Sequence, residues 1–196
     1  MKKINVKDII IPAVALLIFC LVATALLAGT NMLTKDKIAT NAVQKEISAR
    51  GAVLGKSDEE MAAIKFSDVA EADNGVTYAV ATDAEGNEVG YVFTTGAKGY
   101  GGTVSVMVGM DVDGNITGIE ILSHGETPGL GANATKDDFK NRFIGKSGTL
   151  TVNKNSNEGQ DVQAITAATI TSTAVVKAVN LATDAYSQIT GGENNG

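Results

Sequence analysis

The sequence predicts an α+β protein, in which an N-terminal transmembrane helix precedes an antiparallel sheet of two hairpins packed with helices. Three observations lead to this class. An uncharged, mostly apolar run of about 20 residues, the length that crosses a bilayer, occupies 9–28. Two later segments alternate apolar and polar residues, and each turns through a D-x-E/D-G-N motif. A segment near the end, 169–189, repeats apolar residues at helical spacing.

The apolar run predicts a single membrane crossing and its direction. Lysines precede the run closely and follow it only at a distance, namely Lys2, Lys3 and Lys7 before it and Lys35 and Lys37 after it. Because positive residues stay on the cytoplasmic side, we expect a short cytoplasmic segment at 1–8 and a transmembrane helix at 9–30 in the cytoplasmic (inner) membrane. A cleaved signal peptide is the alternative, although the apolar part of such peptides is usually only about 7–15 residues long.

The remainder is expected to lie outside the cytoplasm. The apolar spacing after the membrane run continues a helix as a stalk, which Gly51 or Gly55 could end. A short helix follows, because Ser57 and Glu60 form a capping-box pattern. The expected boundaries are 31–66 for the stalk and short helices, 67–190 for the extracytoplasmic domain and 191–196 for a disordered tail.

Two tight turns place the predicted strands. Asp83–Asn87 and Asp111–Asn115 each separate two β-like runs, and Gly86 and Gly114 supply the positive φ that such turns need. A calcium loop at the second turn is disfavoured, because its glycine falls at the fourth rather than the sixth position and no glutamate stands at the twelfth. A fifth strand is expected within 148–154, and a helix within 135–143.

Composition excludes several classes of function. The chain has 16 basic and 22 acidic residues, so it lacks the positive charge that a nucleic-acid partner requires. Its single cysteine, Cys20, lies in the apolar run and cannot form a disulfide within one copy. A lone histidine, His124, rules out a His-rich metal site, and we predict no metal site.

Two glycine-rich loops lie between the predicted elements. Thr95–Thr103 lacks the Lys-Ser/Thr ending of a phosphate-binding P-loop and leads into a strand rather than a helix. Ser123–Ala134 is long and irregular, as functional loops often are. It contains His124 and Glu126, but neighbouring residues on an extended chain point in opposite directions, so a Ser-His-Glu hydrolase triad is disfavoured.

A cluster of hydroxyls precedes the C-terminal helix, at Thr166, Thr169, Thr171, Ser172 and Thr173. We expect the segment from Thr169 to Thr173 to mark the N-terminus of this helix, with Ser172 and Thr173 as plain caps. The free N–H groups and positive dipole end of a helix N-terminus stabilise phosphate. No lysine or arginine lies near enough to complete a non-covalent phosphate site, since the next one is Lys177.

Three motifs together resemble the flavin-carrying G subunit of the Rnf electron-transport complex, a ferredoxin:NAD oxidoreductase, and its relative, the C subunit of the sodium-pumping NADH:quinone reductase. They are Asp161 followed by Thr166-Ala167-Ala168-Thr169, GYGGTVSVMVGMD at 99–111 and SHGETPGLG at 123–131. Ala167 departs from the family pattern, which usually has glycine there. The resemblance covers nearly the whole chain and implies that 67–190 is an FMN-binding domain.

The resemblance also implies a cofactor and a site. FMN is expected to be joined covalently, as a phosphoester, to the hydroxyl of Thr169. Glu126, Thr127 and Leu130 are expected near the isoalloxazine ring. The other residues that we predict to contribute to cofactor binding are Thr166, Ala167, Ala168, Ser172, Tyr100, Gly101 and His124. No catalytic acid, base or nucleophile is expected, since the protein would act as an electron carrier.

The resemblance implies partners as well: the other Rnf membrane subunits (A, B, C, D and E) and a flavin transferase for maturation. The complex would move Na⁺ or H⁺ while electrons pass through it. Three alternatives stay open. They are an anchored FMN-binding sensor or regulatory protein, the C subunit of a sodium-pumping NADH:quinone reductase, and an extracytoplasmic interaction domain whose threonines merely cap a helix.

Overall fold

The computed structural model describes residues 6–72 and 75–191. Most of the predicted cytoplasmic segment, and the predicted tail beyond Gly191, lie outside the described residues. Internal contacts divide the chain into two units, Met1–Gln44 and Lys45–Gly196. The described part of the first unit is helical, and the second unit holds the sheet and the remaining helices.

Helix α1 runs from Val6 to Leu54 without a break. Its portion from Ile10 onward is long and apolar enough to cross a membrane. The predicted membrane run and the predicted stalk therefore belong to one helix. Gly55 follows the last residue with φ +62°, a left-handed conformation that commonly ends helices, so Gly55 rather than Gly51 ends it. Helix α2, Asp58–Ala63, begins with the predicted Ser57–Glu60 capping box.

The central sheet of the second unit is antiparallel and confirms the predicted α+β class. Its strands are β1 (Lys65–Phe66), β2 (Ala70–Glu71), β3 (Thr77–Thr82), β4 (Glu88–Lys98), β5 (Thr103–Met110) and β6 (Ile116–Ser123). They follow the order β1-β3-β4-β5-β6, with β2 also pairing with β3. The two predicted hairpins, β3–β4 and β5–β6, lie side by side and form most of this sheet.

The predicted turns connect these hairpins. The N–H groups of Asp83 and Asp111 donate to the carbonyls of Asn87 and Asn115. In each turn the aspartate carboxylate also accepts from the backbone and side chain of the asparagine. Gly86 has φ +90° and Gly114 has φ +81°, as expected for tight turns. The carboxylates thus stabilise the turns.

The predicted fifth strand forms, but not in the central sheet. Strand β7, Thr151–Asn153, pairs in parallel with β8, Asp161–Gln163, in a separate small sheet. The predicted helix within 135–143 is divided into α3, Asp137–Lys140, and the 3-10 helix η3, Asn141–Phe143. Another 3-10 helix, η2, Gly131–Thr135, precedes them.

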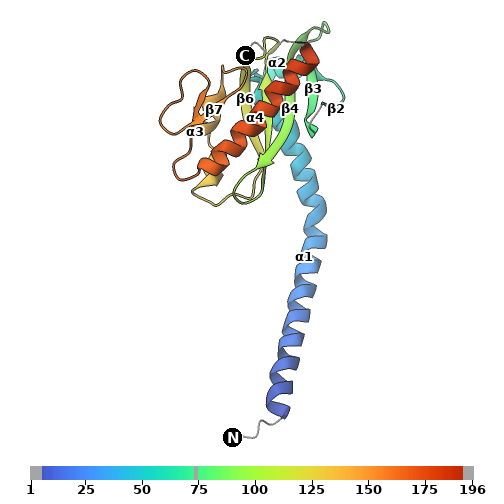
Figure 1. The fold of residues 1–196 in the computed structure, drawn as a ribbon. Helices are drawn as coiled ribbons and strands as arrows, with labels where there is room; N and C mark the ends of the chain where they lie inside the picture. The colour runs from blue at the N-terminus through green and yellow to red at the C-terminus, as the bar shows by residue number, and fades with distance from the viewer. Residues whose placement is uncertain (1–5, 73–74, 192–196) are drawn as a thin grey trace. The chain divides into compact units, whose positions relative to one another are not determined.

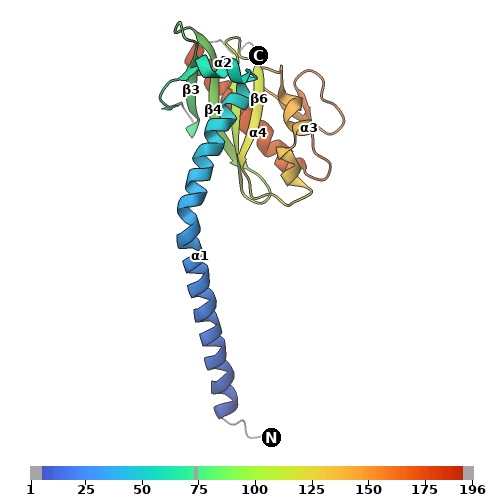
Figure 2. The same ribbon diagram turned by 180° about the vertical axis from the view of Figure 1, so that it is seen from behind.

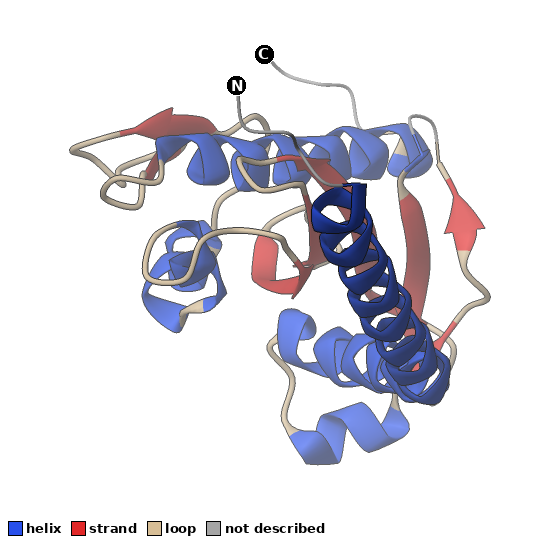
Figure 3. Cartoon of the chain, turned by 90° about the horizontal axis from the view of Figure 1, so that it is seen from below, coloured by secondary structure: helices blue, strands red, loops and turns tan. Residues whose placement is uncertain are grey.

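Helices cover both faces of the sheet. Helix α4, Thr169–Thr190, packs across β4 and β5, and Figure 1 shows it in front of the strands. Phe93, Val106 and Val175 lie fully buried in this layer. On the opposite face, Val53 and Leu54 at the end of α1 pack with strand residues, and Figure 2 shows this side. Viewed from below in Figure 3, the strands lie between the helices.

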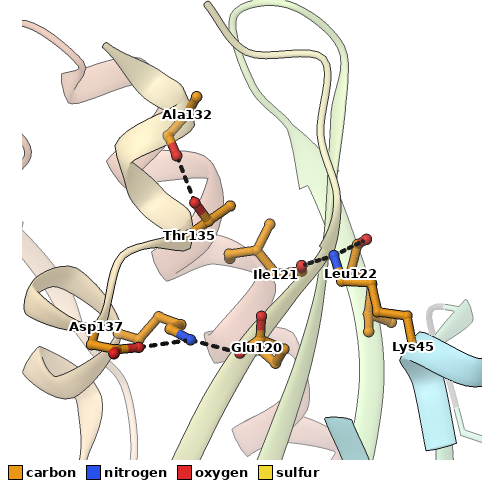
Figure 4. A network of polar contacts seen from close by, with 8 residues as sticks. Lys45, Glu120, Ile121, Leu122, Ala132, Thr135 and Asp137 are labelled. Atoms are coloured by element: carbon orange, nitrogen blue, oxygen red, sulfur yellow. Dashed lines mark hydrogen bonds and ion pairs between the residues drawn. The ribbon is translucent and has the colours of Figure 1, made fainter. Parts of the chain in front are cut away.

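Strand β6 lies at an edge of the sheet, where polar contacts cover it. The Lys45 ammonium donates to the carbonyls of Ile121 and Leu122 at 2.7 and 2.6 Å (Figure 4). On the other side, Lys140 of α3 forms an ion pair with Glu120 at 2.7 Å. The Lys45 contacts engage backbone carbonyls of this edge strand, whereas the Lys140 ion pair engages only the Glu120 side chain. They also hold the strand that leads directly into the loop beginning at Ser123.

Candidate functional site: a pocket at the start of helix α4

A pocket of about 450 Å³ opens where three segments meet. These are the loop between β4 and β5, the loop after β6 and the N-terminus of α4. Its lining residues are Tyr100, Glu126, Thr127, Leu130, Gly131, Ala167, Ala168, Thr169, Ile170 and Thr171. Its size lies within the range of cofactor pockets.

A tight turn presents Thr169 to this pocket. The N–H of Ala168 donates to the carbonyl of Ile165 at 3.0 Å, which closes the turn. Thr169 then begins α4, as predicted, and its side chain is exposed. The hydroxyl therefore stands at the positive end of a 22-residue helix, where a phosphate group is stabilised.

The backbone at Ala167 adopts a conformation that glycine reaches more easily than alanine does. Ala167 has φ +60°, and among the residues that the structure describes it alone combines a side chain with a positive φ. This left-handed conformation brings a Cβ atom close to the following carbonyl and costs roughly 1–2 kcal/mol in a residue other than glycine. Ala167 also occupies the position where the family pattern usually has glycine, so the departure keeps the conformation at a cost in strain.

The hydroxyls that follow Thr169 have structural partners. Ser172 is fully buried, and its hydroxyl accepts from the N–H of Ile165 at 2.9 Å and donates to the carbonyl of Ala168 at 3.0 Å. Thr173 donates to the carbonyl of Thr169 at 2.8 Å. The N-cap residue is Ala168, without a side-chain cap, so the prediction that Ser172 and Thr173 cap the helix is wrong. Both lie inside α4, where a hydroxyl reaches back to the carbonyl four residues earlier.

Glu126 connects all three segments of the pocket. Its side chain is only 6% exposed. One carboxylate oxygen accepts from the N–H of Gly101 at 2.9 Å, and the other accepts from the Thr171 hydroxyl at 2.5 Å. Burial alone would raise the pKa of this carboxyl, but the hydrogen bonds from Thr171, Gly101 and Tyr100 outweigh burial and lower the pKa below its usual value. The carboxylate is therefore ionised at neutral pH.

Close glycine packing holds the two loops together. A Cβ atom on Gly101 would lie 2.0 Å from the carbonyl oxygen of Gly125, and one on Gly131 would lie 2.5 Å from the Glu126 carboxylate. A side chain at either position would force the pocket walls apart. The glycines of the sequence motifs thus allow backbone and carboxylate to approach closely.

His124 has a local role in the same loop. Its Nδ1 atom accepts from the N–H of Glu126 at 3.2 Å. His124 does not line the pocket. The hydrogen bond holds the imidazole against the backbone beside Glu126.

The structure brings most of the predicted site residues together. Those that line the pocket are Tyr100, Glu126, Thr127, Leu130, Ala167, Ala168 and Thr169, whereas Gly101, His124, Thr166 and Ser172 lie outside its lining. Sequence reasoning did not assign Gly131, Ile170 or Thr171 to the site. Thr171 was visible as a member of the hydroxyl cluster, but only the fold shows that it is 2% exposed and bonded to Glu126.

The lining also suits a flavin. Tyr100, Leu130 and Ile170 line the pocket and are 74, 43 and 57% exposed, so an aromatic and two aliphatic side chains are available to a flat ring. Beside them stands the Thr169 hydroxyl at the helix N-terminus, which suits a phosphate. An apolar wall next to a phosphate-favouring position matches the two ends of FMN.

Comparison with known families defines the class of protein. Residues 99–184 match the family described as FMN-binding domain, which covers the three pocket segments. The chain therefore contains an FMN-binding domain. Residues 1–53 match the family described as RnfG N-terminal region, which covers nearly all of α1.

Comparison with individual proteins identifies the family of the whole chain. The G subunit of the proton-translocating ferredoxin:NAD(+) oxidoreductase complex of Clostridium ljungdahlii is 35% identical over 91% of each chain. The G subunit of the Na(+)-translocating complex of Acetobacterium woodii is 34% identical over 96% of this chain and 97% of that protein. The chain belongs to the family of G subunits of the Rnf complex, as the sequence motifs indicated. Among solved structures, the C subunit of the Na(+)-translocating NADH-quinone reductase of Parabacteroides distasonis aligns with a TM-score of 0.48, at 27% identity over 57% of this chain and 61% of that chain.

Proposed function

We propose that this protein is the membrane-anchored, electron-transferring G subunit of an ion-translocating ferredoxin:NAD oxidoreductase, carrying FMN covalently at Thr169. The observation that carries the proposal is the position of the Thr169 hydroxyl, exposed in a pocket and at the start of a long helix. When bound, the flavin supplies reversible uptake and release of electrons. The protein's part is to hold the ring and tune its environment.

Each segment of the pocket would have a distinct part in holding FMN. Thr169 would form the phosphoester, and the N-terminus of α4 would stabilise the phosphate charge. Tyr100, Leu130 and Ile170 would contact the ring. Because the bond itself retains the cofactor, the site needs no cluster of lysines or arginines around the phosphate. The exposed rim would then let electrons reach and leave the flavin.

Assembly follows from the family. We propose that the other Rnf membrane subunits are the partners of this chain, that a flavin transferase attaches the FMN, and that the domain lies outside the cytoplasm. One named relative is a subunit of a proton-translocating complex and the other is a subunit of a Na(+)-translocating complex, so the family includes subunits of both kinds of complex. Tight anchoring by α1 would keep the flavin near its membrane partners.

Peptide mass analysis tests the attachment site. Full-length protein made together with a flavin transferase is expected to carry the mass of FMN, less water, on the peptide containing Thr169. Thr169→Ala is expected to lose this mass completely, because it removes the oxygen that forms the bond. Thr173→Ala is the matched control, since Thr173 lies one turn further along α4 and outside the pocket lining. Flavin retained by Thr169→Ala, or an unmodified Thr169 in the parent protein, would refute the proposal.

A further inference from the structure

The pocket contains one charge that attachment of a flavin does not require. Glu126 lines the pocket, yet only 6% of it is exposed. Thr171, which is 2% exposed, donates its hydroxyl hydrogen to this carboxylate. A buried carboxylate is costly unless hydrogen bonds or opposite charge compensate it, so its presence in the wall calls for a reason.

The surroundings of Glu126 fix its position closely. Its two oxygens accept from separate segments, Gly101 and Thr171. A Cβ atom on Gly99 or on Gly131 would lie 2.5 Å from a carboxylate oxygen, so a side chain at either glycine would displace this group. The carboxylate is therefore preorganised beside the pocket before any cofactor enters.

We propose that the ionised carboxylate of Glu126 lowers the reduction potential of the flavin held in this pocket, and that Thr171 is the positioning residue that keeps this charge in place. The proposal rests on the proposed function, because it concerns the flavin at Thr169. It assigns to Thr171 a role that attachment alone does not give it.

The direction of the effect follows from electrostatics. Reduction adds negative charge to the ring, and a fixed negative charge nearby opposes this addition, more strongly where water is excluded. The elements that adjoin the pocket add little charge of their own. The first turn of α4 has no acidic residue. Helix η2 has no acidic residue in its first turn and no basic residue in its last turn. Of the other titratable groups nearby, His124 on the same loop favours the ionised form of Glu126, and Lys98 and Tyr100 lie beside Gly99 in the adjoining segment. Glu126 is the one acidic or basic residue among the described residues that line the pocket, so it sets the charge of the lining.

Redox titration of full-length protein with attached flavin tests the proposal. Glu126→Gln keeps the shape of the side chain and removes its charge, so the midpoint potential at pH 7 is expected to shift upward. Thr173→Val is the control for loss of a threonine hydroxyl in the same turn of α4, and its potential is expected to equal that of the parent protein. Attached flavin with the same potential in Glu126→Gln and the control would overturn the inference.

Thr171 variants separate positioning from simple structural support. In Thr171→Val the Glu126 carboxyl loses a hydrogen bond, so its pKa should rise and it should become protonated at a higher pH. As the pH is lowered, the flavin potential of Thr171→Val is therefore expected to reach that of Glu126→Gln at a higher pH than the flavin potential of the parent protein does. Thr171→Ser retains the hydroxyl and is expected to behave as the parent. Equal pH profiles for the Val and Ser variants would contradict the role of Thr171, and this pair decides the matter if Glu126→Gln does not fold.

A second readout does not depend on flavin. Carbon NMR of the glutamate carboxyls in flavin-free Thr169→Ala protein is expected to show Glu126 titrating below the usual range. Its signal is identified by its absence from Glu126→Gln, which separates it from Glu60, whose pKa is also lowered by the capping box, and it is expected to titrate at higher pH after Thr171→Val. An unchanged titration after Thr171→Val would refute the positioning role. Lack of flavin on the parent protein would refute the proposed function together with this inference, whereas attached flavin of unchanged potential would refute the inference alone.

Discussion

At the scale of single residues, the turn that precedes Thr169 depends on Ala167. Its φ of +60° is maintained because the turn is closed from both sides, by the Ala168–Ile165 backbone hydrogen bond and by the Ser172 hydroxyl. The neighbouring hydroxyls therefore have different tasks. Ser172 holds the turn, Thr171 holds Glu126, and Thr169 faces the pocket.

Replacement of Ala167 by glycine is expected to stabilise the protein. It removes left-handed strain of roughly 1–2 kcal/mol, partly offset by the greater freedom of glycine in the unfolded chain, so the free energy of unfolding should rise by about 0.5–1 kcal/mol. Urea unfolding of the full chain in detergent measures this change. Ala168→Gly is the control, because Ala168 has φ −135° and is buried, and it is expected to destabilise. A loss of stability in Ala167→Gly would show that the turn is unstrained.

At the scale of elements, the small β7–β8 sheet positions the segment that leads to the turn. Asp161 of β8 accepts from the side chains of Thr151 and Asn153 of β7, each at 2.7 Å. These hydrogen bonds lower the pKa of the Asp161 carboxyl. Asp161 is also the first residue of the motif that ends at Thr169, eight positions further on. Its carboxylate thus anchors the strand from which the motif continues.

Asp161→Asn is expected to destabilise the protein in a pH-dependent manner. A carboxyl whose pKa is lower in the folded than in the unfolded state contributes stability above its unfolded pKa of about 3.9, and loses the contribution as the pH falls through the folded value. The parent protein should therefore be more stable than the variant at pH 7, and the difference should shrink below about pH 4. Chemical unfolding at both pH values measures it, with Asp138→Asn as an exposed control that is expected to change little. A difference that does not vary with pH would contradict this role.

At the scale of the whole molecule, the apolar membrane segment and the start of the folded domain are parts of one continuous helix, α1. The apolar part of α1 and the residues that pack beneath the sheet, such as Val53, belong to the same element. A side chain on Gly109 would lie 2.2 Å from the carbonyl oxygen of Val53, so the end of α1 contacts the backbone of β5 directly. The helix therefore serves both as an anchor and as a core element of the domain.

Membrane orientation yields a direct expectation. In a Cys20→Ala background, a cysteine introduced at Glu85, in the exposed β3–β4 turn, is expected to react with a membrane-impermeant thiol reagent on intact cells. A cysteine introduced at Asn5 is expected to react only after the cells are permeabilised, because the lysines around it favour the cytoplasm. Mass analysis of the labelled protein measures both. The reverse pattern would place the domain in the cytoplasm and overturn the proposed topology.

Local sequence signals by themselves determined most of the secondary structure and the family of this protein. Apolar length and period revealed α1, the hairpins and the start of α4, because these depend on neighbouring residues, and three motifs identified the family. Only the tertiary structure decided the separate roles of the Thr169, Thr171 and Ser172 hydroxyls. It also decided that β7 pairs with β8 instead of the central sheet, and that Thr171 donates a hydrogen bond to Glu126. These contacts join residues far apart in the chain, 45 positions in the last case, and no local pattern encodes such a separation. The same holds for the strain at Ala167, which exists because distant packing closes a turn that alanine alone does not favour.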